Sequence, residues 1–424
     1  MKLSFNLFYI IYIFFIPLFS QAQTKHHKTS AFKSYKGLIM TGYQGWFNTP
    51  QDGAGRGWVH YSRQGKFEQG FSSVDMWPDV SEYEVIYRTP FLKQDGNNAY
   101  VFSSYDSSSV KLHFKWMREY DIDGAFVQRF VTNLKGEKSL NQKNTVLKNA
   151  LHAAKNNDRA ISVMYDFSGM QDSDAEFVIE DWKFLVDSMK ITNRGPQQSY
   201  LYHNQKPLVA LWGVGFNDKR KYSLKVVNKI VDFLQNDPQY GNCSILIGVP
   251  TFWREQKGDA VKDTLFTKIC KKADIIHPWF VGRFDEQGYP RFQQLIKKDL
   301  EWCRINKIDY VPVVFPGFSW HNMHPSSKSN HISRNRGSFY WKQLMGAIDA
   351  GANMIYVAMF DEIDEATAIF KIDQDPPVGK SVFVNFEEGL PSDYYLFLTK
   401  EASAILKKKK EKPKELPIKQ ALMH

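Results

Sequence analysis

The sequence predicts an α/β protein built as a single (β/α)8 TIM barrel with elaborated βα loops. Short apolar segments that end in polar or aromatic residues alternate with longer, Lys-rich amphipathic segments, which is typical of β/α units. Eight such units follow one another in about 370 residues, with no linker rich in Pro, Gly or Ser between them. An open doubly wound sheet is the alternative, but no GxGxxG motif follows the first apolar segment. Eight consecutive units favour the closed barrel.

The predicted strands and helices alternate along the whole domain. Each strand is an apolar run, as in a sheet that is buried on both faces, and each helix has apolar residues at helical spacing. We expect strands within 37–47, 122–130, 160–169, 207–216, 244–253, 273–281, 309–320 and 354–362. We expect helices at 109–120, 143–157, 175–190, 224–236, 291–306 and 338–351.

The chain is expected to begin with a secretory signal peptide at residues 1–22. Lys2 precedes an apolar stretch, and Ser20 and Ala22 are small residues that flank a cleavage point. An uncleaved membrane anchor is the alternative, but Asn6 and Pro17 interrupt a run that barely reaches spanning length. We therefore expect export across the inner membrane, to the periplasm or the cell exterior, with no stable membrane anchor after cleavage.

The composition argues against several classes of protein. Three cysteines, Cys243, Cys270 and Cys303, form no CxxC pair and are too few for a disulfide framework. The net charge is +10, but residues 401–424 hold seven Lys against three Glu, so much of the basicity lies in a tail after a last helix. This tail has no interleaved aromatic residues, which argues for a solvated end rather than a nucleic-acid arm. We expect one catalytic domain over 31–400, without metal, cofactor or nucleic-acid partner.

Polar and aromatic residues gather where the predicted strands end. A barrel places its site there, and long βα loops such as 48–100, which contains His60, help to build it. Sugars have apolar faces that stack on aromatic rings and hydroxyls that bind amides and carboxylates, so this lining predicts an oligo- or polysaccharide substrate. The alternative is that several of these aromatic rings, and His277, belong to the core. The strand ends carry Tyr43, Gln44, Trp46, Gln128, Arg129, Tyr165, Asp166, Trp212, His277, Trp279, Trp320 and His321.

The last predicted strand runs into a crowded acidic segment. Asp361, Glu362, Asp364 and Glu365 occupy four of five consecutive positions. Mutual repulsion at the rim of a barrel should raise at least one pKa, so that one carboxyl can act as an acid while its neighbour acts as a base. This is the division of labour in glycoside hydrolysis, and Glu362 and Glu365 are the expected catalytic pair.

Spacing alone leaves other interpretations of the acidic segment open. Oxygen ligands at short spacing also suit Ca²⁺, as in a calcium-dependent surface protein, and acidic residues favour helix N-termini. A non-catalytic carbohydrate-binding barrel is a further alternative. No DxDxDG loop and no GxSxG elbow is present, which argues against an EF-hand-like site and a serine hydrolase.

Several segments together resemble a known family. YKGLIMTGYQGWF, WPDVSEY, IDGAFVQRF and MFDEIDEATAIFK are similar to bacterial glycoside hydrolase family 71/99-like proteins over most of residues 31–400. The last segment resembles the E-x-x-E loop of glycoside hydrolase family 99, the endo-α-mannosidases and endo-α-mannanases. That family implies a retaining (β/α)8 enzyme that forms a 1,2-anhydro sugar. Glu362 would be the base for the substrate 2-hydroxyl, and Glu365 the acid for the leaving oxygen and later the base for water.

The resemblance implies a secreted hydrolase of an α-linked glycan, with an α-mannoside as the first choice. The family loop reads Asn-Glu-Trp-His-Glu-Gly, whereas residues 361–366 read Asp-Glu-Ile-Asp-Glu-Ala, so both glutamates match and the intervening Trp-His does not. The expected substrate-binding residues are Tyr43, Trp46, His60, Gln128, Asp166, Trp212, Trp279, Trp320 and Asp361.

Overall fold

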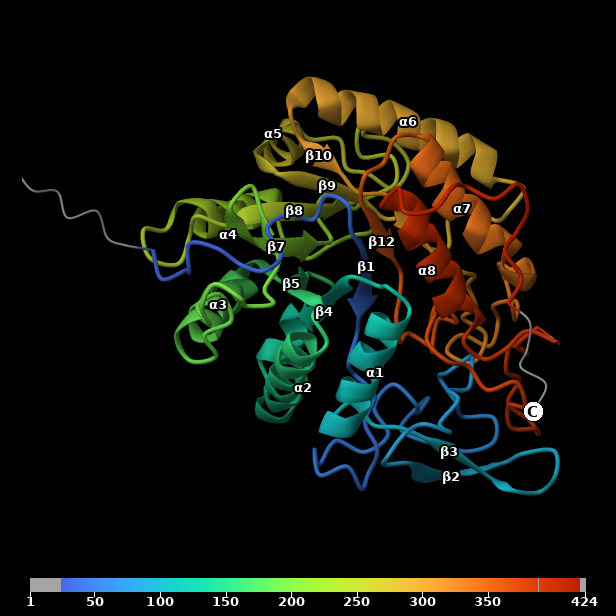
Figure 1. Ribbon diagram of the computed structural model, residues 1–424. Helices are drawn as coiled ribbons and strands as arrows, with labels where there is room; N and C mark the ends of the chain where they lie inside the picture. The colour runs from blue at the N-terminus through green and yellow to red at the C-terminus, as the bar shows by residue number, and fades with distance from the viewer. Residues whose placement is uncertain (1–23, 388, 420–424) are drawn as a thin grey trace, which may run out of the picture.

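The computed structural model describes residues 24–387 and 389–419, and these form a parallel barrel surrounded by helices (Figure 1). The predicted signal peptide, residues 1–22, lies outside the described residues. Within the described part of the chain, no helix combines the length and the apolar character needed to span a bilayer.

The barrel strands are parallel and follow the predicted order. Their neighbours in the sheet run β10-β9-β8-β7-β5-β4-β1-β12-β11, and the strand residues are almost all buried, as in a sheet covered on both faces. Each of the eight predicted segments contains a barrel strand, so the predicted fold class is confirmed. The strands are β1 (Ile39–Tyr43), β4 (Gly124–Phe130), β5 (Ala160–Asp166), β7 (Lys206–Trp212), β8 (Ser244–Val249), β9 (Ile275–Pro278), β10 (Asp309–Tyr310), β11 (Val313–Val314) and β12 (Ile355–Val357).

The barrel closes through its seventh strand, which is split into two short pieces. β10 pairs with β9 on one side, and β11 pairs with β12 on the other. Pro312 lies between the two pieces and has no N–H to give to a ladder, although its carbonyl accepts a bond of 3.1 Å from the N–H of Tyr356. β12 then pairs with β1, which completes the ring.

The helices cover the outside of the barrel, and the six predicted ones are confirmed. Five of them begin and end within three residues of the predicted bounds, and α2 begins six residues earlier, at Glu137. Ser223 caps α4 by accepting a hydrogen bond from the N–H of Val226. Two helices were not delimited from the sequence: α5, which has only nine residues and follows the cap Asp263, and α8 before the tail. The helices are α1 (Ser107–Glu119), α2 (Glu137–Asn156), α3 (Ala175–Asp187), α4 (Leu224–Asn236), α5 (Thr264–Lys272), α6 (Tyr289–Asn306), α7 (Ser338–Asp349) and α8 (Tyr394–Leu406).

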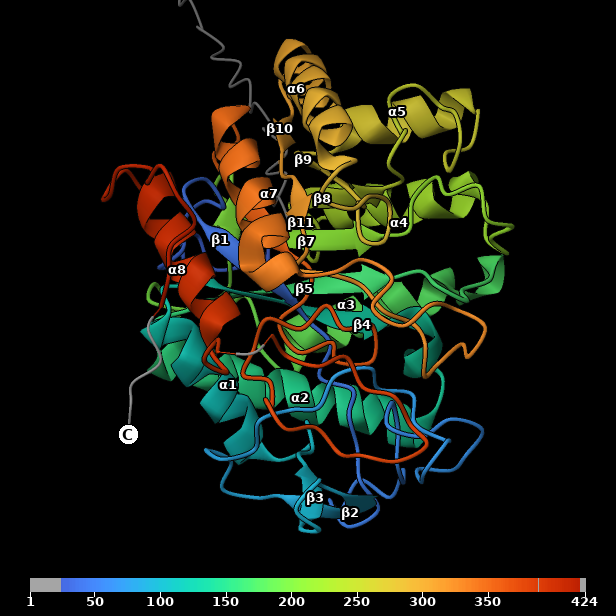
Figure 2. The same ribbon diagram turned by 90° about the vertical axis from the view of Figure 1, so that its right-hand side faces the viewer.

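The long segment 48–100 between β1 and α1 forms an irregular layer beside the barrel. It contains an antiparallel hairpin of β2 (Tyr87–Leu92) and β3 (Asn98–Val101), which lies at one end of the molecule on the side of α1 and α2 (Figures 1 and 2). The hairpin contacts a second long segment, because the N–H of Val378 donates to the carbonyl of Leu92 at 3.0 Å. A short strand, β6 (Tyr202–His203), pairs antiparallel with β7.

Both ends of the described chain pack on the barrel. Lys25 forms an ion pair of 2.7 Å with Asp187, before the expected domain start at residue 31. The expected boundary between residues 400 and 401 falls inside α8. Beyond α8, Lys407 pairs with Asp123, so the segment expected to be a solvated end also contacts the body of the molecule. Lys419 likewise pairs with the largely buried Asp393.

Candidate active site

A cavity of about 500 Å³ opens at the C-terminal ends of the barrel strands. Eight of the eleven predicted site residues line it: Trp46, Gln128, Asp166, Trp212, Trp279, Trp320, Glu362 and Glu365. The residues that sequence reasoning did not select for the site include Gln44, Phe130, Ser168, Phe216, Asp218, Arg220, Arg283 and Phe318. Strands far apart in the sequence therefore deliver their terminal side chains to one place, as the barrel geometry requires.

The acidic segment after β12 is a tight loop rather than the start of a helix. The N–H groups of Thr367 and Ala368 both donate to the carbonyl of Glu362, at 3.1 and 3.0 Å. The buried guanidinium of Arg334 holds the end of the loop by donating to the carbonyls of Ala366 and Ala368 at 2.8 and 2.7 Å. The helix-cap interpretation of the acids is therefore wrong, and the loop itself fixes where the carboxyls point.

Asp361 ties the acidic loop to the end of β1. Its Oδ1 accepts the N–H of Gln44 at 2.8 Å, and its Oδ2 accepts the N–H of Gly45 at 2.9 Å. Burial raises the pKa of Asp361 to about 6, although the two backbone donors oppose that shift. The carboxylate is fully buried and does not line the cavity, so it holds the backbone of the site.

Glu362 reaches the cavity with both carboxyl oxygens held. Oε1 accepts from the side-chain amide of Gln44 at 3.0 Å, and Oε2 accepts from the hydroxyl of Thr367 at 3.1 Å. Burial, followed by the charges of Glu365, Asp364 and Asp361, raises the pKa of Glu362 well above its ordinary value. The two donors favour the ionised form, so they partly offset the cost of burying the charge.

Glu365, three residues after Glu362, also lines the cavity. Burial and the nearby charge of Asp364 raise the pKa of Glu365 to about 8, against the effect of a hydrogen bond from Trp320. The raised pKa values of Glu362 and Glu365 mean that this pair retains a proton near neutral pH. The two donors to Glu362 favour its ionised form, so the two glutamates have chemically different surroundings.

Asp364 points away from the cavity toward the long segment 48–100. Its Oδ2 lies 3.0 Å from Nδ1 of His60, and burial raises the pKa of Asp364 to about 8. Burial, with the charges of Lys143 and Arg56, lowers the pKa of His60 to about 3. The His60 ring stacks on Trp46 with centroids 3.7 Å apart and an interplanar angle of 5°. His60 thus supports the inner face of a cavity wall instead of lining the cavity.

Aromatic rings form the walls of the cavity. Trp212 meets Trp279 edge to face at 5.2 Å, and Trp46 lies 5.5 Å from Phe130. Trp320, which is 37% exposed, stands at the rim. Flat apolar rings around polar groups suit the faces of a pyranose.

Four polar atoms in the same lining have no hydrogen-bond partner among the described residues. They are two indole N–H donors, from Trp46 and Trp212, and two amide oxygen acceptors, from Gln44 and Gln128. Buried polar groups are normally paired, so unpaired ones in a cavity mark where a ligand's polar groups would bind. Matched donors and acceptors are what sugar hydroxyls require.

One side of the cavity carries charged groups that the sequence did not single out together. Asp166 accepts the N–H of Ser168 at 2.7 Å, and burial raises the pKa of Asp166 to about 6. The guanidinium of Arg220 lies 4.9 Å from the ring of Phe216 and donates to Asp218 at 2.7 Å. Arg220 lies in a loop after β7, and a loop has no periodic sequence pattern from which a functional side chain could be predicted.

Other strand-end residues belong to the core. The fully buried Tyr43 places its hydroxyl 2.8 Å from Nδ1 of His113, outside the cavity. Arg129 forms a buried ion pair with Asp181, which also accepts the hydroxyl of Tyr165 at 2.7 Å. His277 is buried with its ring 4.4 Å from that of Tyr356. Tyr43, Tyr165 and His277 therefore belong to the core, which is the alternative that the sequence left open for the strand-end aromatic rings and for His277.

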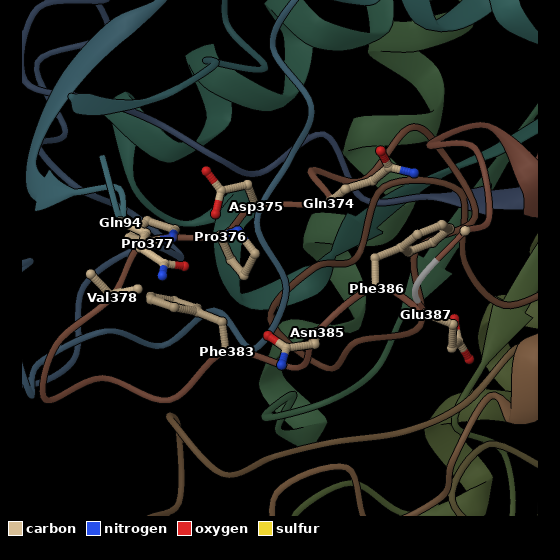
Figure 3. Close-up of a pocket in the computed structure, with 11 residues that line it drawn as sticks. Gln94, Gln374, Asp375, Pro376, Pro377, Val378, Phe383, Asn385, Phe386 and Glu387 are labelled. Carbon is tan, nitrogen blue, oxygen red and sulfur yellow. The ribbon is translucent and has the colours of Figure 1, made fainter. Parts of the chain in front are cut away.

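A second cavity, of about 850 Å³, lies elsewhere and lacks these features. Figure 3 shows that its lining side chains come from irregular segments rather than from strand ends. Most belong to residues 374–389, with Gln94 added from the β2–β3 hairpin. It contains none of the predicted site residues and no Trp.

A closed (β/α)8 barrel with paired carboxyls after its last strand has the architecture of TIM-barrel glycosidases. Two structures of a glycoside hydrolase family 99 endo-α-mannosidase from Bacteroides thetaiotaomicron are similar to this chain, with TM-scores of 0.63 and 0.62. Each is 16% identical and covers 88% of this chain and 98% of that chain; the first is a complex with bis-tris-propane. No protein-family profile and no curated protein sequence matches the chain. At this identity the similarity establishes the fold, which agrees with the fold that the family resemblance implied.

Proposed function

We propose that the protein is a glycoside hydrolase that cleaves an α-linked glycan, with an α-mannoside as the first substrate to test. The observation that carries this proposal is the placement of Glu362 and Glu365 together in an aromatic-lined cavity at the strand ends. Paired carboxyls, one protonated and one ionised, are the usual catalytic equipment for this reaction. The similar fold of a family 99 endo-α-mannosidase supports the choice of substrate class.

In the proposed mechanism Glu365 acts as the acid and Glu362 as the base. Glu365, whose raised pKa of about 8 keeps it protonated near neutral pH, gives its proton to the leaving glycosidic oxygen. Glu362 removes the proton from the substrate 2-hydroxyl, whose oxygen attacks C1 and forms a 1,2-anhydro sugar. Glu365, now ionised, takes a proton from a water molecule whose oxygen attacks C1, and the C1–O2 bond of the anhydro ring breaks as Glu362 returns its proton to O2. Two displacements at C1 give a product with retained configuration.

The stereochemistry of this route restricts the substrate. The 2-hydroxyl can displace a leaving group only from the opposite face, so the two must be trans, as in α-mannosides but not in α-glucosides. A route through a glycosyl ester on one carboxylate also retains configuration and is the alternative mechanism.

We further propose that the protein is exported and that its substrate is an oligo- or polysaccharide of the periplasm or the cell exterior.

The proposed function is tested by screening the purified protein against α-mannans and other α-linked glycans. We expect hydrolysis of an α-mannoside with a product of retained configuration by NMR. A fluorosugar ester trapped on Glu362 and found by mass spectrometry would instead support the ester route. Binding without hydrolysis across the panel would favour a non-catalytic carbohydrate-binding barrel. The calcium-dependent alternative requires that EDTA lower the melting temperature.

A further inference from the structure

Lys143 is a buried cation that the proposed chemistry does not use. It lies on α2, only 3% exposed, next to the end of β1. Its Nζ donates to the backbone carbonyl of Gln44 at 3.1 Å and lies 5.6 Å from the ring of Phe130. A buried ammonium is costly, so a lysine at this place calls for a reason.

The carbonyl that Lys143 binds belongs to a peptide unit that is held at both ends. The N–H of the same unit, on Gly45, donates to Asp361 at 2.9 Å. Gly45 has a φ of 55°, and a Cβ there would come within 2.5 Å of Val146 on α2. This close approach, which needs glycine, brings the peptide oxygen to α2 and hence to Lys143.

The side chain that precedes this peptide unit contacts Glu362 directly. Gln44 donates its side-chain N–H to Oε1 of Glu362 at 3.0 Å. The position of this donor depends on the orientation of the Gln44 backbone, which Lys143 and Asp361 fix between them. The path from Lys143 to the carboxyl of Glu362 therefore runs through one peptide unit and one amide.

We propose that Lys143 is a positioning residue for Glu362 that acts through the Gln44–Gly45 peptide. The inference rests on the proposed function, because it assigns Lys143 a task in a reaction that Glu362 performs. The charges that face Lys143 oppose one another. Burial is the largest of the influences that lower the pKa of Lys143 to about 7. The charges of Arg129 and Arg56 also lower this pKa, whereas those of Asp361 and Asp166 raise it. His60 also faces this ammonium.

The first test compares Lys143→Met with Lys148→Met, a change at an exposed lysine on the same helix. We expect K143M to lower kcat by about 10- to 100-fold, the loss of a hydrogen-bonded charge, with KM within about threefold. The acidic limb of its pH profile should move to higher pH, because a less well-supported Glu362 holds its proton longer. K148M should match the wild type. A K143M enzyme with unchanged kcat and pH profile overturns the inference.

The second test asks whether Lys143 acts through Gln44. We expect Gln44→Met to lower kcat, and the double variant Q44M/K143M to lose far less than the product of the two single losses. Fully multiplicative losses would show that Lys143 acts by another path and would overturn the inference. Lys143→Gln, a smaller uncharged variant, replaces K143M in both tests if circular dichroism shows that K143M does not fold.

A third measurement separates this inference from the proposed function. The pKa of Glu362 can be followed by NMR with carboxyl-labelled glutamate, and the resonance assigned by its loss in Glu362→Gln. We expect a higher pKa of Glu362 in K143M than in the wild type. This outcome would support the positioning role even if no glycan were hydrolysed, in which case only the proposed function fails. An unchanged pKa of Glu362 would overturn the positioning role alone.

Discussion

At the scale of single residues, each carboxyl of the acidic loop has its own partners. Asp361 binds backbone N–H groups, Glu362 binds two side-chain donors, and Asp364 faces His60. Glu365 has a hydrogen bond from Trp320, and its pKa is raised to about 8. The four acidic residues look nearly equivalent in the sequence, but their different partners give their carboxyl groups different chemical properties.

Replacing either proposed catalytic glutamate by glutamine should abolish turnover without loss of folding. Glu365→Gln removes the acid and Glu362→Gln the base, and each loss should lower kcat by about 10²- to 10⁴-fold. The melting temperature of E362Q should stay the same or rise, because this change removes a buried charge from a repulsive cluster. The melting temperature of E365Q should change little near neutral pH, where Glu365 already carries a proton. Kinetic assays and calorimetry measure both effects. Near-normal activity in either variant would contradict its assigned role.

The raised carboxyl pKa values should also appear in the pH dependence of stability. The pKa of Glu365 is about 8 when folded and ordinary when unfolded, so the folded state holds an extra proton between these values. Its stabilising effect is complete below the unfolded pKa and is lost as pH rises through about 8. Denaturant titrations from about pH 4.5 to 8.5 should therefore show a smaller alkaline loss of stability in E365Q than in the wild type. Parallel curves would contradict this.

At the scale of elements, the loop after β11 carries Trp320 and is anchored by the distant segment 48–100. Buried Asp75 accepts the N–H groups of His321 and Asn322 at 2.8 and 2.7 Å, and also binds the hydroxyl of Ser319. The N–H of Ser319 donates to the carbonyl of Glu365 at 3.0 Å. The segment 48–100 thus sets the position of the part of the cavity rim that Trp320 forms.

Asp75→Ala should loosen this rim. We expect kcat/KM to fall by about tenfold or more, since a positioned aromatic ring and the neighbouring Glu365 both lose support. Asp95→Asn, an exposed change in the same segment 48–100, provides the control and should leave kcat/KM unchanged. A D75A enzyme with normal kcat/KM would show that Ser319, His321 and Asn322 hold the rim without this carboxylate.

At the scale of the whole molecule, the C-terminal segment locks the start of the barrel. One oxygen of Asp123 accepts the N–H of Ile39 at 2.8 Å, and the other pairs with Lys407. Lys407→Met should leave this largely buried carboxylate without its cation and lower the free energy of unfolding by about 1.5 to 3 kcal/mol. Urea denaturation measures this, with Lys409→Met, at an exposed position, as the control. Equal midpoints for the two variants would contradict the role of Lys407.

The barrel and eight of the residues that line the cavity could be predicted because both follow local patterns. Apolar runs mark the strands, and barrel geometry converts strand ends into site positions, as for Gln128 and Trp279. Tyr43 and Trp46 are nearly adjacent, yet one packs in the core and the other lines the cavity. Arg220 and Lys143 were missed because a loop and a helix that looks merely amphipathic bring them to the site. Such positions depend on tertiary contacts that no local pattern encodes.

The closure of the barrel sets a condition on the order in which the chain can fold. β1 is bordered by β4 and by β12, so Ile39, at the start, pairs with Ile355, near the end. A growing chain without β12 leaves the edge of β1 open and offers its backbone groups to other chains. Fragments that stop before residue 354 should therefore aggregate rather than form part-barrels, and productive folding must wait until synthesis is nearly complete.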